Sequence, residues 1–300
     1  MNSSLLEAFR IVMQTGTISD SAEALGRSQS AVSRMLDRLE EELQIRLFDR
    51  RKGLILPTLE AHALLEDVER ALISLSDLGT RARQIRDGHE SNLTIAVLPA
   101  LGIDFVPLVI SRFLELKPNI GVSSHVLASH NVEQWVANHQ VELGFAETPF
   151  RRTGFETLVF VDEPYVLAMP AGHRLAELDL VRLDDLRGER MINFTAVVAP
   201  RGMLDEMLQH SGMSIESRAE TSISAAMVSM VANGLGVALV DPITATLKRD
   251  PNVVIRRFQP SIPCRIARMM PQKEKQRAVV DMFLGCAEEV RDSLLALRDW

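Results

Sequence analysis

The spacing of apolar residues changes at about residue 90, and this change most constrains how the chain can fold. Before it, apolar side chains recur three and four residues apart, which predicts one helix after another. From Asn92 onward, short apolar runs such as 93–99 alternate with amphipathic stretches such as 104–116. That alternation predicts βαβ units on a parallel sheet. The sequence therefore predicts a helical N-terminal part followed by an α/β part that closes either as one domain or as two lobes.

The first 57 residues predict a helix-turn-helix with a wing. Three helices are expected, over residues 5–15, 20–25 and 29–43, with Ser4, Ser19 and Ser28 as their N-caps. Two short helices joined by a tight glycine-containing turn form the helix-turn-helix unit. After the third helix, the charged turn 49–53 lies between apolar residues, which predicts a β-hairpin with a basic tip.

A nucleic-acid site in this part depends on local charge, because the chain has a net charge of -7 and residues 1–57 hold eight basic and eight acidic residues. A recognition helix needs short polar residues at its start and cations beside the phosphates. Gln pairs with adenine and Arg with guanine, each worth about 1–3 kcal/mol of discrimination. The candidates are Ser19, Gln29, Ser30, Ser33, Arg34, Arg38, Arg50, Arg51 and Lys52.

A long helix is expected from Thr58 to about Asp87. Its apolar positions alternate four and three residues apart over about three heptads, which indicates a seam against a partner helix. The predicted dimer contacts are Leu65, Val68, Leu72 and Leu75. The alternative is a long helix that packs on its own domain, and the spacing of the apolar residues agrees with this as well.

Residues 7–50 resemble the DNA-binding domain of LysR-type transcriptional regulators. The matching positions are Phe9, Gly16, Ala22, Leu25, Gln29, Ala31, Val32, Ser33, Leu39, Glu40, Leu47, Phe48, Arg50 and, just beyond them, Thr58. Ser21, Ser30 and Ala61 depart from the family pattern by small-for-small changes, so we expect DNA binding to be kept. The resemblance implies a winged helix-turn-helix over 1–58, a linker helix over 59–88 and a two-lobed effector domain, similar to periplasmic binding proteins, over 89–300.

The resemblance also implies what such a chain does. It would be a bacterial sequence-specific regulator of transcription that binds double-stranded DNA at a pseudo-palindromic operator. It would form homodimers that pair into tetramers, and RNA polymerase is a further implied partner. An effector would act by binding one arrangement of the oligomer better than another. A ligand-independent repressor with a vestigial cleft is the alternative, which the apolar Ala100 and Leu101 leave open.

The effector site is expected where strands end, because helix N-termini there offer free N–H groups. The candidate residues are Pro99, Ala100, Leu101, Ser129, Asn131, Thr195, Ala196, Thr221, Asp241 and Pro242. The stretches 98–107 and 232–245 further resemble the regulators of opine catabolism and of lysine biosynthesis. That likeness implies an amino-acid-derived effector, with Asp241 as the partner of its amine.

The residues do not indicate an enzyme, a metal site, a disulfide scaffold or a membrane protein. The seven histidines show no metal-ligand spacing, and no nucleophile or dinucleotide motif occurs, so we expect no enzyme, no catalytic or metal site and no cofactor. Two cysteines cannot form a disulfide scaffold and fit a reducing compartment; they are expected to be buried and structural. No segment has the length and apolarity of a membrane helix, and the start of the chain does not resemble a signal peptide. We therefore expect a cytoplasmic protein without a membrane partner.

Overall fold

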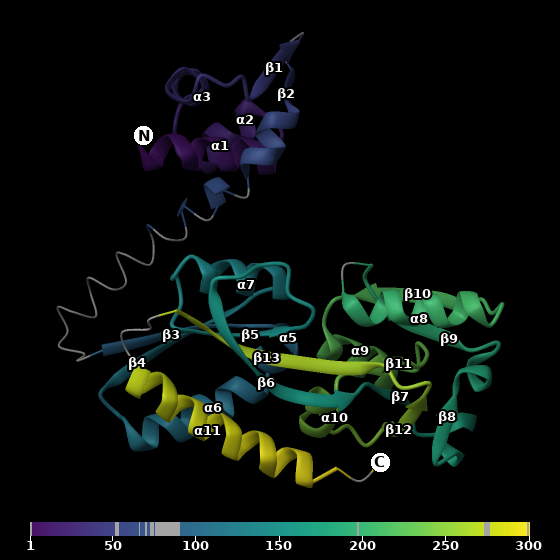
Figure 1. The fold of residues 1–300 in the computed structure, drawn as a ribbon. Coiled ribbons are helices and arrows are strands. Elements are labelled where there is room, and N and C mark those ends of the chain that lie inside the picture. The colour runs from purple at the N-terminus through teal and green to yellow at the C-terminus, as the bar shows by residue number, and fades with distance from the viewer. Residues whose placement is uncertain are drawn as a thin grey trace. The chain divides into compact units, whose positions relative to one another are not determined.

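The computed structural model describes residues 2–51, 54–65, 67–69, 71, 72, 75, 91–196, 198–272, 277–298 and 300. The chain divides into two compact units, Met1–Gly88 and His89–Trp300 (Figure 1). No helix among the described residues has the length and apolarity that crossing a lipid bilayer requires.

The first unit contains three helices and a hairpin. Its elements are α1 (Ser3–Thr15), α2 (Ile18–Ala24), α3 (Gln29–Leu43), β1 (Phe48–Arg51) and β2 (Leu54–Pro57). The two strands pair antiparallel, with Phe48 opposite Pro57. The apolar stripes of the three helices meet in one core with the start of the hairpin, where the Phe9 and Phe48 ring centroids lie 5.8 Å apart. The predicted helix-turn-helix and wing are therefore both present.

Two of the three predicted N-caps are wrong. α1 begins two residues earlier than expected, because Asn2 and not Ser4 is the cap: Asn2 Oδ1 accepts the Ser4 N–H at 3.1 Å. α2 begins at Ile18, because Thr17 Oγ1 accepts the Asp20 N–H at 3.1 Å, which leaves Ser19 inside the helix. Ser28 caps α3 as predicted, and its Oγ accepts the Ala31 N–H at 3.2 Å. In each case the cap is the nearest side-chain oxygen before the helical turn.

The start of the predicted linker helix is helical at every described position from residue 59 to 75. Ala61 and Val68 are buried against the core of the first unit, and Leu65 and Leu72 pack partly on it. Leu75 is 48% exposed. The first part of the apolar stripe that was expected to face a partner helix thus packs on the unit's own core. Among the four predicted dimer contacts, Leu75 is the one with an exposed side chain. The remainder of that helix, residues 76–88, lies outside the described residues.

The second unit contains a five-stranded sheet. Its strands, in spatial order, are β4 (Ile120–Val126), β3 (Ser91–Val97), β5 (Leu143–Glu147), β13 (Pro263–Pro271) and β6 (Phe155–Pro164). β3 runs parallel to β4 and β5, whereas β13 runs antiparallel to β5 and β6. Helix α6 (Phe105–Leu116) packs on α11 (Arg277–Ala296), and both lie on the face opposite to α7 (Ser129–Ala137) (Figure 1).

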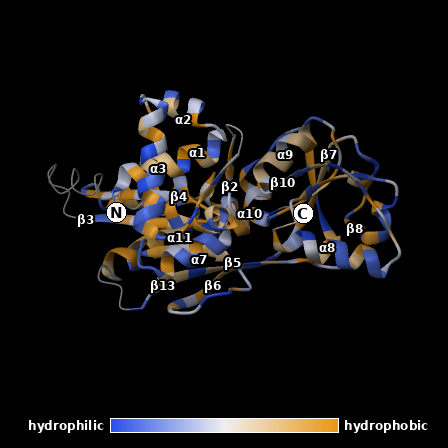
Figure 2. Ribbon diagram, turned by 90° about the horizontal axis from the view of Figure 1, so that it is seen from above, coloured by the Kyte–Doolittle hydropathy of each residue, from blue (hydrophilic) through white to orange (hydrophobic). Residues whose placement is uncertain are grey.

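A second, four-stranded sheet lies beside the first. It consists of β11 (Ala238–Val240), β7 (Val166–Pro170), β12 (Val253–Gln259) and β8 (Leu180–Arg182), and a parallel pair, β9 (Arg190–Phe194) and β10 (Glu216–Thr221), extends this lobe. Helices α8 (Ala199–His210), α9 (Ser224–Ala232) and α10 (Pro242–Leu247) follow strands of this lobe, which also contains the 3-10 turns η1 (Arg174–Glu177) and η2 (Leu183–Leu186). Helix α5 (Pro99–Gly102) follows β3 and packs on β4 and α6 of the first lobe. Hydrophobic residues gather in α9 and β7 (Figure 2).

The chain passes between the two sheets twice, from β6 to β7 and back from β12 to β13. The two-lobed architecture is therefore confirmed. The predicted βαβ units on a parallel sheet are present, since β3 runs parallel to β4 and β5. The prediction did not include the antiparallel strands: β7 pairs antiparallel with β11 and β12, and β13 with both of its neighbours. The long strands β6 and β13 form the antiparallel ribbon that joins the lobes.

Candidate functional site

The start of α3 presents the polar residues expected of a recognition helix. The Ser28 cap turns the chain into α3, and Gln29, Ser30 and Arg34 are exposed on its first turns. Ser33 is half-buried. Free backbone N–H groups at a helix start favour anions such as phosphate, so this end of α3 combines backbone donors with side chains that can read bases.

Two further candidates lie beside this helix. Ser19 of α2 is exposed, and Gln29 Nε2 donates to its Oγ at 3.3 Å, so the structure brings these two residues together. Arg38 is exposed on α3 and forms an ion pair with Glu42 at 3.1 Å. A phosphate that binds Arg38 therefore competes with an exposed carboxylate, and such surface pairs are weak.

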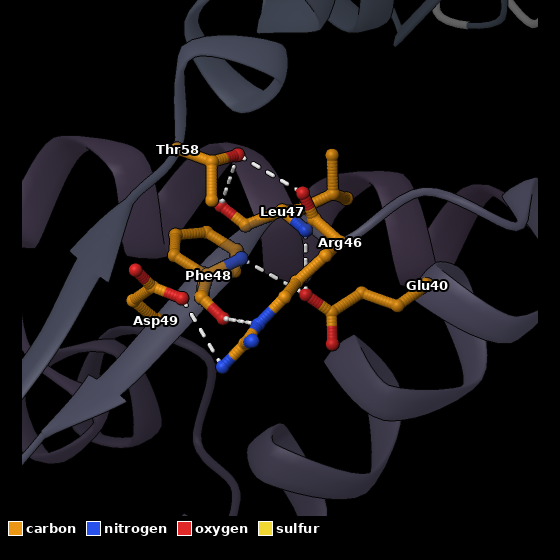
Figure 3. Close-up of polar contacts among 6 residues, drawn as sticks. All are labelled: Glu40, Arg46, Leu47, Phe48, Asp49 and Thr58. Carbon is orange, nitrogen blue, oxygen red and sulfur yellow. Dashed lines mark hydrogen bonds and ion pairs between the residues drawn. The ribbon is translucent and has the colours of Figure 1, made fainter.

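The hairpin is attached to α3 by side chains that sequence reasoning did not single out for this role (Figure 3). Glu40 Oε1 accepts the N–H groups of Leu47 and Phe48 at 2.6 and 2.9 Å. Thr58 Oγ1 donates to the carbonyl oxygens of Arg46 and Leu47 at 3.0 and 3.1 Å. Hydrogen bonds to a charged acceptor are stronger than neutral ones, so Glu40 fixes the hairpin relative to the recognition helix.

The basic tip of the hairpin is only partly described. Arg50 and Arg51 lie in β1, opposite Ile55 and Leu54. Their side chains, and Lys52 as a whole, lie outside the described residues.

In the second unit, candidates of the first lobe gather where its strands end. Pro99 and Ala100 begin α5 and are half-buried, while Leu101 is fully buried and packs in the core. Ser129 begins α7, and its Oγ accepts the Glu147 N–H at 3.1 Å. Asn131, also half-buried, stands in the same first turn of α7. The expectation that Leu101 lines a ligand site is not supported, because its side chain is enclosed by protein.

Candidates of the second lobe meet at the ends of β9 and β10. The Thr195 N–H donates to the Thr221 carbonyl oxygen at 3.2 Å, and Thr221 Oγ1 accepts the Ile223 N–H at 3.3 Å. Ala196 is exposed beside them. Thr195 Oγ1 is buried and has no hydrogen-bond partner among the described residues. A buried hydroxyl without a partner is costly, which makes it a candidate donor or acceptor for a bound molecule.

Asp241 caps a helix, and its expected role as the partner of an effector amine stays a prediction. Its side chain is fully buried, and its Oδ1 caps α10 by accepting the Thr244 N–H at 2.8 Å. Pro242, the first residue of α10, is buried as well. Burial raises the pKa of Asp241, and the hydrogen bonds from Thr244 and Ser224 oppose that rise. Oδ1 therefore serves the protein's own helix, while the buried Oδ2 has no hydrogen-bond partner among the described residues.

Glu147 is the acidic side chain that the sequence reasoning missed. It ends β5, and Tyr165 donates its hydroxyl hydrogen to Glu147 Oε1 at 3.0 Å. Burial raises the pKa of Glu147 from 4.5 to about 7, the Tyr165 hydrogen bond opposes the rise, and Asp241 adds to it. Burial likewise raises the pKa of Tyr165 well above 10, so Tyr165 stays a donor. The available signal was an acid at the carboxyl end of a predicted buried strand.

No group of three or more potential metal ligands occurs among the residues that the structure describes. The sites above consist of hydroxyls, side-chain amides, backbone N–H groups, arginines and two carboxyls, Glu147 and Asp241, whose pKa is raised by burial.

Comparison with known proteins places both units in one family. Residues 3–62 match the family "bacterial regulatory helix-turn-helix protein, lysR family", and residues 86–292 match the LysR substrate binding domain. The chain is 34% identical over 301 residues to the octopine catabolism/uptake operon regulatory protein OccR of Rhizobium meliloti, covering 99% of this chain and 98% of that protein. It is 29% identical over 280 residues to the transcriptional activator LysR of Escherichia coli, covering 93% and 90%.

Solved structures agree on the fold. The crystal structure of full-length CbnR in complex with its target DNA has a TM-score of 0.70 at 22% identity and covers 97% of this chain and 100% of that chain. With family matches over both units, and with relatives that are regulators of transcription, no catalytic role is indicated. The chain thus belongs to the LysR family of DNA-binding transcriptional regulators, with a helix-turn-helix part followed by an effector-binding part.

Proposed function

We propose that the chain binds a pseudo-palindromic operator through α3 and the β1–β2 hairpin, and that an amino-acid-derived effector bound between the two lobes of the second unit modulates the response. The exposed polar set at the start of α3, Gln29, Ser30 and Arg34, carries the DNA part of the proposal. These are the residue types that reach base edges from a recognition helix, and Ser19 supports Gln29 from the neighbouring helix.

Two lines support the effector part. The polar residues Ser129, Thr195 and Thr221 stand where strands of both lobes end, which is where open α/β sheets bind ligands. OccR and NocR, relatives at 34% and 30% identity, are a regulator of octopine catabolism and a regulatory protein of Agrobacterium. An amino-acid-derived effector agrees with the role in octopine catabolism that the name of OccR gives. It also agrees with the hydroxyl groups of the site, which can donate hydrogen bonds to a carboxylate.

The assembly that goes with this function is a homodimer through the helix that follows Thr58, and pairs of dimers through the second unit. RNA polymerase is the further partner through which such a regulator would act. Exposed Leu75 on the described part of the helix supports the dimer.

Operator binding is tested by selecting DNA from a randomised double-stranded library with the full chain, then measuring affinity by fluorescence anisotropy at several salt concentrations. Arg34→Ala is expected to weaken binding by about 1–3 kcal/mol and to relax the base preference at one position. Arg187→Ala removes an exposed arginine of the second unit and serves as the matched control. Failure to select any sequence, or equal loss in both variants, would contradict the proposal.

Effector binding is tested by thermal denaturation of the full chain with amino acids, opines, organic acids and sugars. A ligand at a hundredfold excess over its dissociation constant stabilises the protein by about 2.7 kcal/mol. Stabilisation by sugars or aromatic acids, with none by amino acids or opines, would refute the proposed effector class.

A further inference from the structure

The pair Glu147 and Tyr165 lies where the chain passes from one lobe to the other. Glu147 ends β5 of the first sheet, and Tyr165 stands between β6 of the first sheet and β7 of the second. The Tyr165 hydroxyl reaches Glu147 at 3.0 Å, while its ring lies edge-on to Phe194, with centroids 5.9 Å apart. Phe194 ends β9, directly before Thr195 and its unpartnered buried hydroxyl. Glu147 thus connects the candidate residues of both lobes.

The described groups around Glu147 supply no positive charge. Asp241, the N-cap of α10, contributes to the raised pKa of Glu147, and burial raises the pKa of Tyr165 and of Cys264 on β13 well above their ordinary values. No ion pair joins Glu147 or Asp241 to a described lysine, arginine or histidine at 4.0 Å or less. The buried groups of this cluster are therefore acids, a thiol and a phenol.

The arginines of the neighbouring strand β13 lie near other carboxylates. Arg265 pairs with Asp162 at 2.9 Å, whereas Arg268 lies 4.0 Å from Glu288 and its buried Nε has no hydrogen-bond partner among the described residues. On α7, His130 is exposed. Glu133, also on α7, accepts the backbone N–H groups of residues 151 and 152. α5 carries no titratable side chain.

We infer that Glu147 recognises a cationic group of the effector, an ammonium or a guanidinium, and that Tyr165 is the positioning residue that holds the Glu147 carboxylate for it. The inference depends on the proposed effector-binding function and specifies the chemistry of that site. A bound cation supplies the countercharge that the protein itself lacks there, and a hydrogen bond between two charged groups is strong in a partly buried site.

Binding of a cation then releases a proton. With its pKa raised to about 7, Glu147 carries a proton in about half of the molecules at neutral pH. A neighbouring positive charge favours the ionised carboxylate and lowers this pKa, so the carboxyl hydrogen passes to solvent as the ion pair forms. Recognition of a cationic effector is therefore coupled to pH, and the release falls as the pH rises above about 7.

Isothermal titration calorimetry of the full chain tests the inference with matched probes. L-Arginine is compared with L-citrulline, and L-lysine with L-norleucine, because each pair differs in charge at similar length. At least one cationic probe is expected to bind about tenfold or more tightly than its neutral counterpart. Repeating the titration at pH 7 in buffers of different ionisation enthalpy should show release of about half a proton, and less at pH 8.

Two variants separate recognition from folding. Glu147→Gln should remove both the preference for the cationic probe and the proton release, whereas Glu115→Gln, on an exposed carboxylate of α6, should change neither. Tyr165→Phe removes a hydrogen bond that lowers the pKa of Glu147, so it should move proton release to higher pH. A variant that acted only by loosening the fold would weaken charged and neutral probes alike and leave the pH range unchanged.

The inference is overturned if citrulline and norleucine bind as well as arginine and lysine, if Glu147→Gln keeps the cation preference, or if neither cationic probe binds at millimolar concentration. Operator selection and the wider ligand screen decide the proposed function separately, so a neutral effector found there would retain that function and refute only the role of Glu147.

Discussion

Replacing Glu147 by Gln should stabilise the second unit in a pH-dependent way. In the unfolded chain this carboxyl ionises with its ordinary pKa of 4.5, and in the folded chain with a pKa of about 7. The folded state therefore binds more protons between these values, and stability is lost as the pH rises through them. Each pH unit is worth about 1.4 kcal/mol, so Gln removes a penalty of about 1 kcal/mol at pH 5 and about 3 kcal/mol at pH 8.

Urea denaturation followed by tryptophan fluorescence measures this penalty in the full chain. The two tryptophans, Trp135 and Trp300, both belong to the second unit, so the signal reports on that unit. Gln also changes the pH-independent contacts of the side chain. The decisive quantity is therefore the increase of about 2 kcal/mol in the stability difference between pH 5 and pH 8.

A second glutamate provides the control. Glu115 pairs with Arg112 on the surface, and its side chain is 67% exposed. Glu115→Gln should change stability by no more than about 1 kcal/mol at either pH. If the Glu147→Gln difference were the same at pH 5 and pH 8, Glu147 would ionise alike in the folded and unfolded chain, and the reasoning from burial would fail.

Three further predictions concern other parts of the chain. Glu40→Ala leaves two buried backbone N–H groups unpaired and should cost about 2–4 kcal/mol, seen as faster amide hydrogen exchange in the hairpin; unchanged exchange would exclude this attachment. Leu75→Asp should shift the chain from dimer to monomer in sedimentation velocity, and a variant that sediments unchanged would remove Leu75 from the interface. Burial raises the pKa of the Cys264 and Cys286 thiols, so neither should react with Ellman's reagent at pH 8 until urea unfolds the chain; rapid reaction in the native protein would contradict this.

The helical first unit was largely predictable because its signals are local. The α3 cap at Ser28 and the end of α1 at Gly16, where φ is 73°, depend on residues within one turn. The other two caps failed because several hydroxyl and amide side chains precede each helix, and only geometry selects Asn2 and Thr17. In the second unit the joining ribbon was missed, because β6 alternates little and is exposed along most of its length.

The effector site shows a different limit of sequence reasoning. The criterion that a residue directly follows a predicted strand correctly placed Ser129 and Thr195 at strand ends. The same criterion does not distinguish an acid that faces a ligand from an acid that caps a helix. Asp241 has the better sequence signal, an acid directly before Pro242, and that signal is the one for an N-cap. The role of Glu147 depends on a tyrosine 18 residues away in the chain and on burial, neither of which a local pattern contains.

The attachment of the hairpin to α3 determines how a signal can travel to DNA. Glu40 and Thr58 bind neighbouring stretches of the same backbone, and Thr58 also caps the helix that follows, accepting the Ala61 N–H at 3.2 Å. The recognition helix, the hairpin and the start of that helix are thus held as one rigid body. An effector should then alter the distance and rotational phase between half-sites, with contacts inside each half-site preserved. Footprints measured with and without effector would therefore differ in the DNA that lies between the half-sites, while the protected bases inside each half-site would stay the same.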